Sequence, residues 1–167
     1  MNVFCFFVTD EKQYNPTIFI MKKIAMIPAR YGATRFPAKL MQFIGNKTVI
    51  QHTYESTITT KLFDDVIVVT DSDIIFHEVL SFGGKALFSK SEHESGSDRI
   101  AEAIKEISAD IVVNVQGDTP FIKKEPLKKL LSQFKDSKVQ VASIMKVISK
   151  EEVNNPNFVK VVEIKIL

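Results

Sequence analysis

Three cationic side chains lie close together in the segment from Pro28 to Lys39, which reads PARYGATRFPAK. These are Arg30, Arg35 and Lys39, and the segment follows a short apolar run. A polyphosphate is bound by several fixed positive charges and free backbone N–H groups, and the loop after a parallel strand supplies both. Two prolines and a glycine favour a defined loop shape. The segment therefore predicts a phosphate-binding loop, and a solvated basic loop stays open as the alternative, above all for Arg35.

A second candidate group is the carboxylate of Asp118, in the segment NVQGDTP from Asn114 to Pro120. It follows the apolar run IVVNV, so it is expected at the end of a buried strand. Mg²⁺ prefers oxygen ligands and takes one or two carboxylates together with substrate phosphates. Asp118 is therefore predicted to bind Mg²⁺, and the alternative is an aspartate that bonds its own turn. Gln116 is predicted to contact substrate or, alternatively, loop backbone.

The third segment is HESGSDR, from His93 to Arg99, placed before a helix expected to begin near residue 97 or 98. Ser95 and Gly96 at a helix start would present backbone N–H groups to an anion, and Arg99 would add a guanidinium. In the alternative interpretation, Ser97 is only a helix cap and Arg99 is a surface cation. We assign no general base to His93.

Short β-branched runs alternate with amphipathic stretches along the chain. This alternation predicts a doubly wound α/β fold with a mostly parallel sheet. The expected strands span 23–27, 65–70, 85–88, 111–115, 139–147 and 159–166, and the expected helices span 49–60, 73–82, 98–107 and 125–134. Ligands bind at the carboxyl ends of the strands in such sheets, so we expect the three segments to converge there.

The composition favours one globular domain: 45% of the 167 residues are hydrophobic and 25% are charged. The interspersed charges, with a formal net charge of +2, do not favour nucleic acid as a partner. No apolar run approaches the roughly 20 residues that span a membrane. A lone cysteine, Cys5, fits a reducing cytoplasm, which is the expected location. Residues 1–20 precede Met21 and are interpreted as a disordered or non-native extension, or alternatively as a genuine extension that packs on exposed core or joins the sheet edge.

In this order the motifs resemble those of a known family. PAR-x3-TR-x-PAK, H-x-SG-x-DR, NVQGD-x-P and NPNFVKVV at residues 155–162 are similar to motifs of the CMP-Kdo synthetases, which activate 3-deoxy-manno-octulosonate (Kdo). The resemblance spans 21–162. It implies the nucleotide-diphospho-sugar transferase fold and the transfer of CMP from CTP to Kdo, with Mg²⁺ as cofactor, for lipopolysaccharide biosynthesis.

The resemblance also implies roles for individual residues. It implies that Arg30, Lys39 and Asp118 act in catalysis and that Asp118 holds the metal. The implied nucleotide-binding residues are Pro28, Ala29, Arg30, Arg35, Lys39, Ser95, Gly96 and Arg99, and the implied sugar-binding residues are Gln116, Asn157 and Lys160. Thr119 stands where most relatives carry an acidic residue, so one negative charge beside the expected metal is absent.

The family continues well beyond NPNxVKVV, whereas this chain ends five residues later, at Leu167. In relatives the later part supplies a second metal-binding aspartate and the elements that form a homodimer. The resemblance therefore implies an incomplete nucleotide-binding domain at 21–167, with CTP and Kdo as partners and with weakened or absent activity. Two alternatives stay open: an acylneuraminate-type cytidylyltransferase and a non-catalytic CTP-binding remnant.

Overall fold

The structure is a computed structural model that describes residues 3–7, 21–32, 36–90, 93, 95–145, 149 and 154–155 of the chain. Arg35, Asn157, Lys160 and the strand expected at 159–166 lie outside these residues. Among the described residues, no helix is both long and apolar enough to cross a lipid bilayer.

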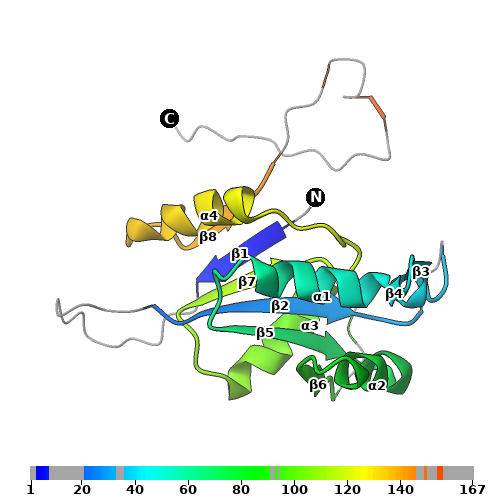
Figure 1. Cartoon of the computed structure of the whole chain (residues 1–167). Coiled ribbons are helices and arrows are strands. Elements are labelled where there is room, and N and C mark those ends of the chain that lie inside the picture. Colours follow the sequence, from blue (N-terminus) through cyan, green and yellow to red (C-terminus); the bar gives the residue numbers. More distant parts are fainter. Residues whose placement is uncertain are drawn as a thin grey trace.

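A six-stranded sheet forms the centre of the molecule, with strand order β6-β5-β2-β7-β1-β8 (Figure 1). Its parallel strands are β2 (Lys23–Ala29), β5 (Asp65–Thr70), β6 (Ala86–Phe88) and β7 (Ile111–Val115). From β2 the chain moves outward to β5 and β6, and it then returns to place β7 on the other side of β2. The strand order therefore reverses between β2 and β7, and ligands bind in α/β sheets at such a reversal.

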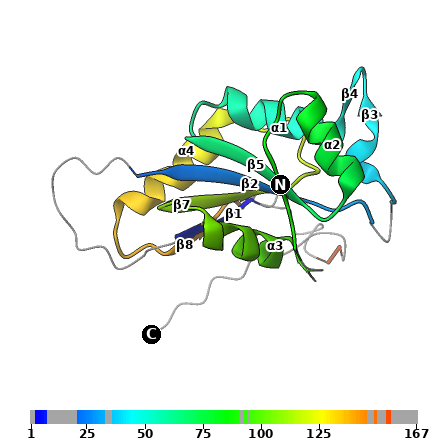
Figure 2. The ribbon, with the colours of Figure 1, turned by 90° about the horizontal axis from the view of Figure 1, so that it is seen from below.

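Helices cover both faces of this sheet, which confirms the predicted doubly wound fold. Figure 2 shows α1 (Val49–Thr59), α2 (Asp73–Ser81) and α4 (Lys124–Ser132) on one face and α3 (Gly96–Ala103) on the other. Successive side chains of a strand point to opposite faces. Ala25 and Ile27 of β2 accordingly join the core under α1, α2 and α4, and Ile24 and Met26 join the core under α3.

Helix ends follow from capping side chains. Ser72 caps α2 by accepting a hydrogen bond from the N–H of Ile75, and Gly83, with φ of 78°, lies just after the end of that helix. The start of α3 was expected near residue 97 or 98, but the helix begins at Gly96. The reason is that Ser95, rather than Ser97, accepts the capping hydrogen bond from the N–H of Asp98 at 3.2 Å.

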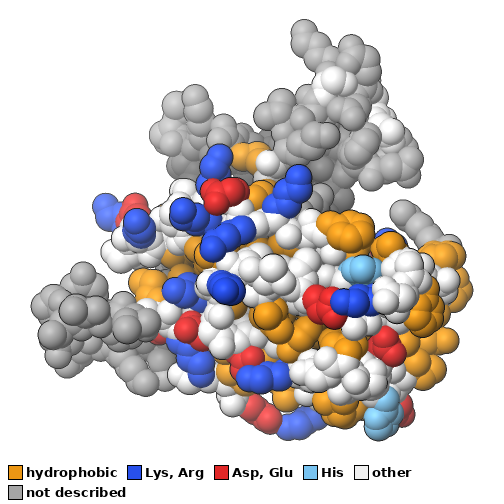
Figure 3. Space-filling model, in the orientation of Figure 1, with side chains coloured by type: hydrophobic (Ala, Val, Ile, Leu, Met, Phe, Trp, Pro, Cys, Tyr) orange, Lys and Arg blue, Asp and Glu red, His pale blue; other side chains and the backbone are white. Residues whose placement is uncertain are grey.

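Several short elements were not predicted. β3 (Phe43–Ile44) and β4 (Lys47–Thr48) form a hairpin whose turn contains Gly45 with φ of 66°. The helical turn η1 (Lys39–Met41), just before this hairpin, was not predicted either. By contrast, η2 (Ile104–Glu106) and η3 (Gln133–Lys135) continue α3 and α4, within or at the end of the helices expected at 98–107 and 125–134. Figure 3 shows hydrophobic side chains gathered toward the hairpin, where Phe43 and Ile44 are exposed, and acidic and basic side chains interspersed elsewhere on this face.

Part of the N-terminal segment pairs with the sheet. β1 (Val3–Phe7) lies between β7 and β8 (Val141–Ser143) and is antiparallel to both. For these five residues the structure matches the alternative in which the segment joins the sheet. The interpretation of the rest of 1–20 concerns residues outside those described, and it stays a prediction, as does the non-native origin of the segment.

Candidate active site

The three motif segments meet at Pro28. A Cβ atom added to Gly96 would lie 2.9 Å from Cγ of Pro28, and one added to Gly117 would lie 3.1 Å from the Pro28 carbonyl oxygen. The starts of α3 and of the turn after β7 are therefore packed against the same residue of β2. Glycine at these positions allows this approach without displacing a neighbour. The expected convergence at the carboxyl ends of the strands is confirmed.

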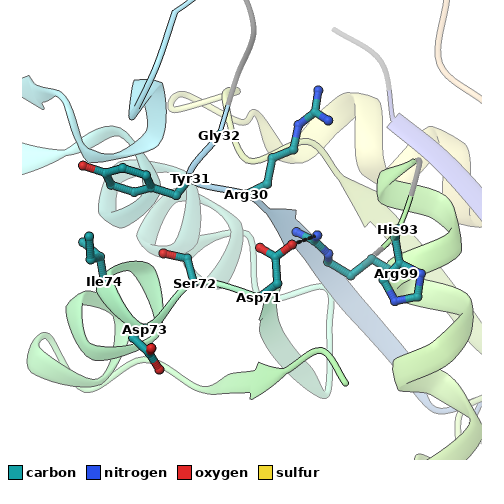
Figure 4. Close-up of a pocket in the computed structure, with 9 residues that line it drawn as sticks. All are labelled: Arg30, Tyr31, Gly32, Asp71, Ser72, Asp73, Ile74, His93 and Arg99. Atoms are coloured by element: carbon teal, nitrogen blue, oxygen red, sulfur yellow. Dashed lines mark hydrogen bonds and ion pairs between the residues drawn. The ribbon is translucent and has the colours of Figure 1, made fainter. Parts of the chain in front are cut away.

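A pocket of about 540 Å³ opens beside this junction (Figure 4). This volume lies within the range of small-molecule sites. The lining residues come from the ends of β2 and β5 and from around the start of α3: Arg30, Tyr31, Gly32, Asp71, Ser72, Asp73, Ile74, His93 and Arg99. Sequence reasoning identified Arg30 and Arg99 but missed Tyr31 and the residues from Asp71 to Ile74. The end of β5 is also a carboxyl end, yet no site role was predicted for its polar residues.

Arg99 is only 4% exposed, so its interpretation as a surface cation is wrong. Its Nη1 donates to the carbonyl of Ala29, and its Nη2 donates to Oδ2 of Asp71. The side chain reaches across the end of the sheet toward Asp71 (Figure 4). Its Nε has no hydrogen-bond partner among the described residues. Its predicted contact with the nucleotide stays a prediction.

Lys39 and Asp118 form an ion pair, with Nζ of the lysine 2.6 Å from Oδ2 of the aspartate. Both side chains are close to half exposed, at 47% and 44%, so both remain accessible. The loop that carries Lys39 is closed by a 3.0 Å hydrogen bond from the N–H of Ala38 to the carbonyl of Tyr31. The structure thus brings together one of the cations predicted for the triphosphate and the carboxylate predicted for the metal. Arg30 is exposed, and its side chain points away from Asp71 (Figure 4).

Helix α1 contacts the turn that carries Asp118 through the side chain of Thr53. The buried hydroxyl of Thr53 lies within hydrogen-bond distance of the carbonyl of Gly117, at 2.8 Å. The N–H of Thr119 closes the turn on the carbonyl of Gln116. The Gln116 side chain donates to Oδ1 of the buried Asn114 at 2.9 Å, so it is anchored at the strand end.

Glu102 of α3 holds the segment that precedes this helix. Its carboxylate accepts hydrogen bonds from Nε2 of His93, from the hydroxyl of Ser89 at 2.9 Å and from the N–H of Lys90. The hydrogen bond from His93 is the main cause that lowers the pKa of Glu102 below its usual value, against an opposing effect of burial. Sequence reasoning missed Glu102, because an acidic residue within a helix is usually solvated.

The number of carboxylates near Pro28 limits the kind of metal site that these residues can form. Among the described residues, no group of three or more His, Cys, Asp or Glu side chains is arranged to hold a metal ion. Asp118 offers a carboxylate that is 44% exposed. A single carboxylate suits Mg²⁺, which keeps several waters and takes oxygens from substrate phosphates. These residues fit a Mg²⁺ ion that arrives with a nucleotide rather than one held by the protein alone.

The chain is similar in sequence to known cytidylyltransferases. The family model described as Cytidylyltransferase matches residues 24–165. The 3-deoxy-manno-octulosonate cytidylyltransferase of Flavobacterium johnsoniae is 64% identical over 146 residues, which cover 85% of this chain and 60% of that protein. The enzyme of the same name from Escherichia coli is 39% identical over 142 residues, covering 84% and 58%. The chain thus spans about 60% of the length of the curated relatives it matches.

Solved structures show the same fold. A structure of CMP:2-keto-3-deoxy-manno-octonic acid synthetase complexed with CTP is similar with a TM-score of 0.67 and 39% identity, covering 71% of this chain and 49% of that one. 4-Diphosphocytidyl-2C-methyl-D-erythritol synthase, at 20% identity and a TM-score of 0.56, with 71% and 57% covered, shares the fold alone. The family match covers most of the chain and includes all three segments that meet at Pro28, so the chain belongs to the cytidylyltransferase family.

Proposed function

We propose that this chain supplies the nucleotide-binding part of a CMP-Kdo synthetase, which transfers CMP from CTP to Kdo and releases pyrophosphate. The observation that carries the proposal is the Lys39–Asp118 pair at the reversal of strand order, because it places a cation and a carboxylate at one accessible point. The names of the relatives, which the chain matches over about 60% of their length, support Kdo as the acceptor.

In the proposed reaction, a hydroxyl oxygen of Kdo forms a bond to the α-phosphorus of CTP. The bond from that phosphorus to the bridging oxygen of the leaving pyrophosphate breaks, and the hydroxyl proton passes to solvent. Phosphoryl transfer depends mainly on positioning and on electrostatic stabilisation of the phosphate oxygens. The active groups must therefore be fixed cations and a rigid frame.

Three side chains of this chain supply those groups in the proposal. Lys39 neutralises charge on the leaving pyrophosphate, and the planar guanidinium of Arg30 binds two phosphate oxygens at once. Asp118, which pairs with Lys39 in this structure, would hold Mg²⁺ together with the nucleotide phosphates. The metal, when bound, supplies Lewis-acid stabilisation of the phosphate oxygens. Arg35, Ser95 and Gly96 are proposed as further nucleotide contacts.

The remaining predictions accompany this proposal. Gln116, Asn157 and Lys160 are proposed to contact the sugar acid, and the protein is proposed to act in the cytoplasm, as a homodimer only where the later, dimer-forming part of the family is present. The single cysteine supports the compartment, and the family resemblance supports the dimer.

Thermal unfolding with CTP and Mg²⁺ tests the nucleotide-binding part of the proposal. A ligand at 100 times its Kd stabilises the folded state by about 2.7 kcal/mol, so millimolar CTP is expected to raise the Tm by several degrees. Removal of Mg²⁺ by a chelator is expected to reduce this shift, and UTP and ATP at the same concentration serve as controls. A folded chain that CTP does not stabilise contradicts the proposal.

Pyrophosphate release then tests the acceptor. Release with CTP and Kdo, but not with CTP and N-acetylneuraminate, is expected if the chain catalyses the reaction by itself. Preference for N-acetylneuraminate would instead support the acylneuraminate-type alternative. CTP binding without turnover of either sugar acid would support a non-catalytic CTP-binding chain.

A further inference from the structure

Arg99 joins three parts of the molecule at the edge of the pocket. It lies in the first turn of α3, and its two terminal nitrogens donate to the carbonyl of Ala29 and to the carboxylate of Asp71. Ala29 is the last residue of β2 and pairs with Thr70, the last residue of β5. Asp71 follows directly. One guanidinium therefore connects α3 to the ends of two neighbouring strands.

Both of these strand ends continue into the pocket wall. Ala29 is followed by Arg30 and Tyr31, and Asp71 begins the stretch that includes Ser72 to Ile74. The direction of the Ala29 carbonyl is linked to the path of the next peptide, because the peptide bond is planar. A group that fixes this carbonyl thus restricts the position of the Arg30 backbone.

The charges show why Asp71 is required. A buried guanidinium without a partner is strongly unfavourable, and Arg99 is 4% exposed. Asp71 is the carboxylate that pairs with it, at a position where the Asp71 side chain is one third exposed. The planar fork of arginine can satisfy a carbonyl and a carboxylate at the same time, whereas a lysine cannot span both.

We propose that Asp71 and Arg99 are positioning residues that place Arg30 for the phosphates of the nucleotide. In this proposal, Arg99 acts on Arg30 through Ala29 and Asp71, whether or not it also contacts the nucleotide. The inference rests on the proposed nucleotide-binding function and extends it to two residues at the ends of different elements.

The test compares Asp71→Asn with Asp65→Asn. Asp65 is the matched control, because it lies at the opposite end of the same strand, is 27% exposed and pairs with Nζ of Lys85 at 2.9 Å. Three measurements are made on each protein: the Tm, the Kd for CTP with Mg²⁺ by calorimetry, and the backbone amide NMR shifts of Arg30 and Tyr31 without nucleotide.

Asp71→Asn is expected to shift the amide signals of Arg30 and Tyr31 and to weaken CTP binding by about 10- to 100-fold, the size of effect that small misplacements cause. Asp65→Asn is expected to leave the Kd within about twofold of the parent value, whatever its effect on the Tm. Asp71→Glu keeps the carboxylate and is expected to restore most of the affinity. If Asp71→Asn does not fold, Arg99→Lys replaces it, because this variant keeps the positive charge but loses the two guanidinium donors that reach Ala29 and Asp71 together.

Three results would overturn the inference. The first is a folded Asp71→Asn variant with the parent Kd, and the second is an equal loss of affinity in Asp65→Asn, which would indicate a general effect on folding. The third is an unshifted Arg30 amide signal in Asp71→Asn. This result would show that the contact between Arg99 and Asp71 does not affect the position of Arg30. If the parent chain does not bind CTP, the proposed function fails, and the role of Asp71 in nucleotide binding fails with it. The amide shifts still report whether Asp71 and Arg99 fix the position of Arg30.

Discussion

Lys39 and Asp118 neutralise each other at a point that solvent still reaches. Exposed pairs of this kind contribute less than about 1 kcal/mol to folding. We therefore predict that Lys39→Met or Asp118→Asn changes the free energy of unfolding by less than about 1 kcal/mol, while CTP binding with Mg²⁺ weakens more than about tenfold, as loss of a charge-assisted contact does. Denaturant unfolding and calorimetry measure the two effects.

The pair of Lys47 and Glu55 provides the control for this prediction. Its Nζ–Oε2 distance is also 2.6 Å, and its side chains are 36% and 39% exposed. Lys47→Met should therefore have a similarly small effect on stability and no effect on the Kd for CTP. Equal weakening of CTP binding in both lysine variants would contradict the role given to Lys39.

At Gly117, the addition of a single Cβ atom is expected to affect stability. An added Cβ would lie 3.1 Å from both the Pro28 carbonyl oxygen and Cδ1 of Leu40, and the backbone oxygen cannot turn away. We predict that Gly117→Ala lowers the free energy of unfolding by about 1–3 kcal/mol, the range for overpacking. Gly32→Ala, where an added Cβ meets nothing within 4 Å, should leave the Tm nearly unchanged. Equal Tm values for the two variants would contradict the close contact.

Sequence reasoning predicted roles for Arg30, Lys39 and Asp118, because their types and spacing are typical of phosphate and metal binding, and these roles stay predictions. It could not find Asp71 or Glu102. Each of these carboxylates acts through partners that are distant in sequence, 28 positions for Asp71 and 9 for Glu102. In a sequence, both are indistinguishable from solvated charges at a helix start or on a helix face.

At the scale of elements, α3 holds the site through two charged side chains, three positions apart. Arg99 reaches the ends of β2 and β5, and Glu102 holds the segment between β6 and α3. The helix thus does more than cover one face of the sheet. It links the pocket wall to the core between α3 and the sheet, to which Ile100 of the same helix belongs.

The pKa of Glu102 makes this link dependent on pH. Because the hydrogen bond from His93 lowers that pKa in the folded state, Glu102 stabilises the fold above the pKa of an unfolded glutamate, about 4.3. That stabilisation is lost as the pH falls through the lowered folded-state value. We predict that Glu102→Gln is less stable than the parent at neutral pH and that the difference shrinks below about pH 4. Thermal unfolding between pH 3 and 8 would measure it, and a difference independent of pH would contradict it.

The accuracy of the element predictions followed the strength of the local signal. β5 and β7 were predicted to the residue, because continuous β-branched runs end at polar positions. The hairpin β3–β4 was missed, because strands of two residues show no periodicity. The start of α3 was misplaced because Ser95 and Ser97 are equally good caps by type, and only the contact with Asp98 distinguishes them.

At the scale of the whole molecule, β1 lies between two strands that are far apart in sequence. The family match begins at residue 24, so this strand lies outside the region shared with relatives. We predict that a variant beginning at Met21 has a lower Tm and associates more readily, because the facing edges of β7 and β8 lose their backbone partner. Thermal unfolding and light scattering test this, and an unchanged Tm with a monomeric variant would show that β1 contributes nothing.

The ion pair of Lys39 and Asp118 joins residues that are 79 positions apart. During synthesis, the loop that carries Lys39 leaves the ribosome long before the turn after β7, which carries Asp118. Chain closure over such a distance must come before the contact can contribute any free energy. The proposed nucleotide site is therefore complete only after β7 has docked beside β2, so a nucleotide bound there could not stabilise the first half of the nascent chain.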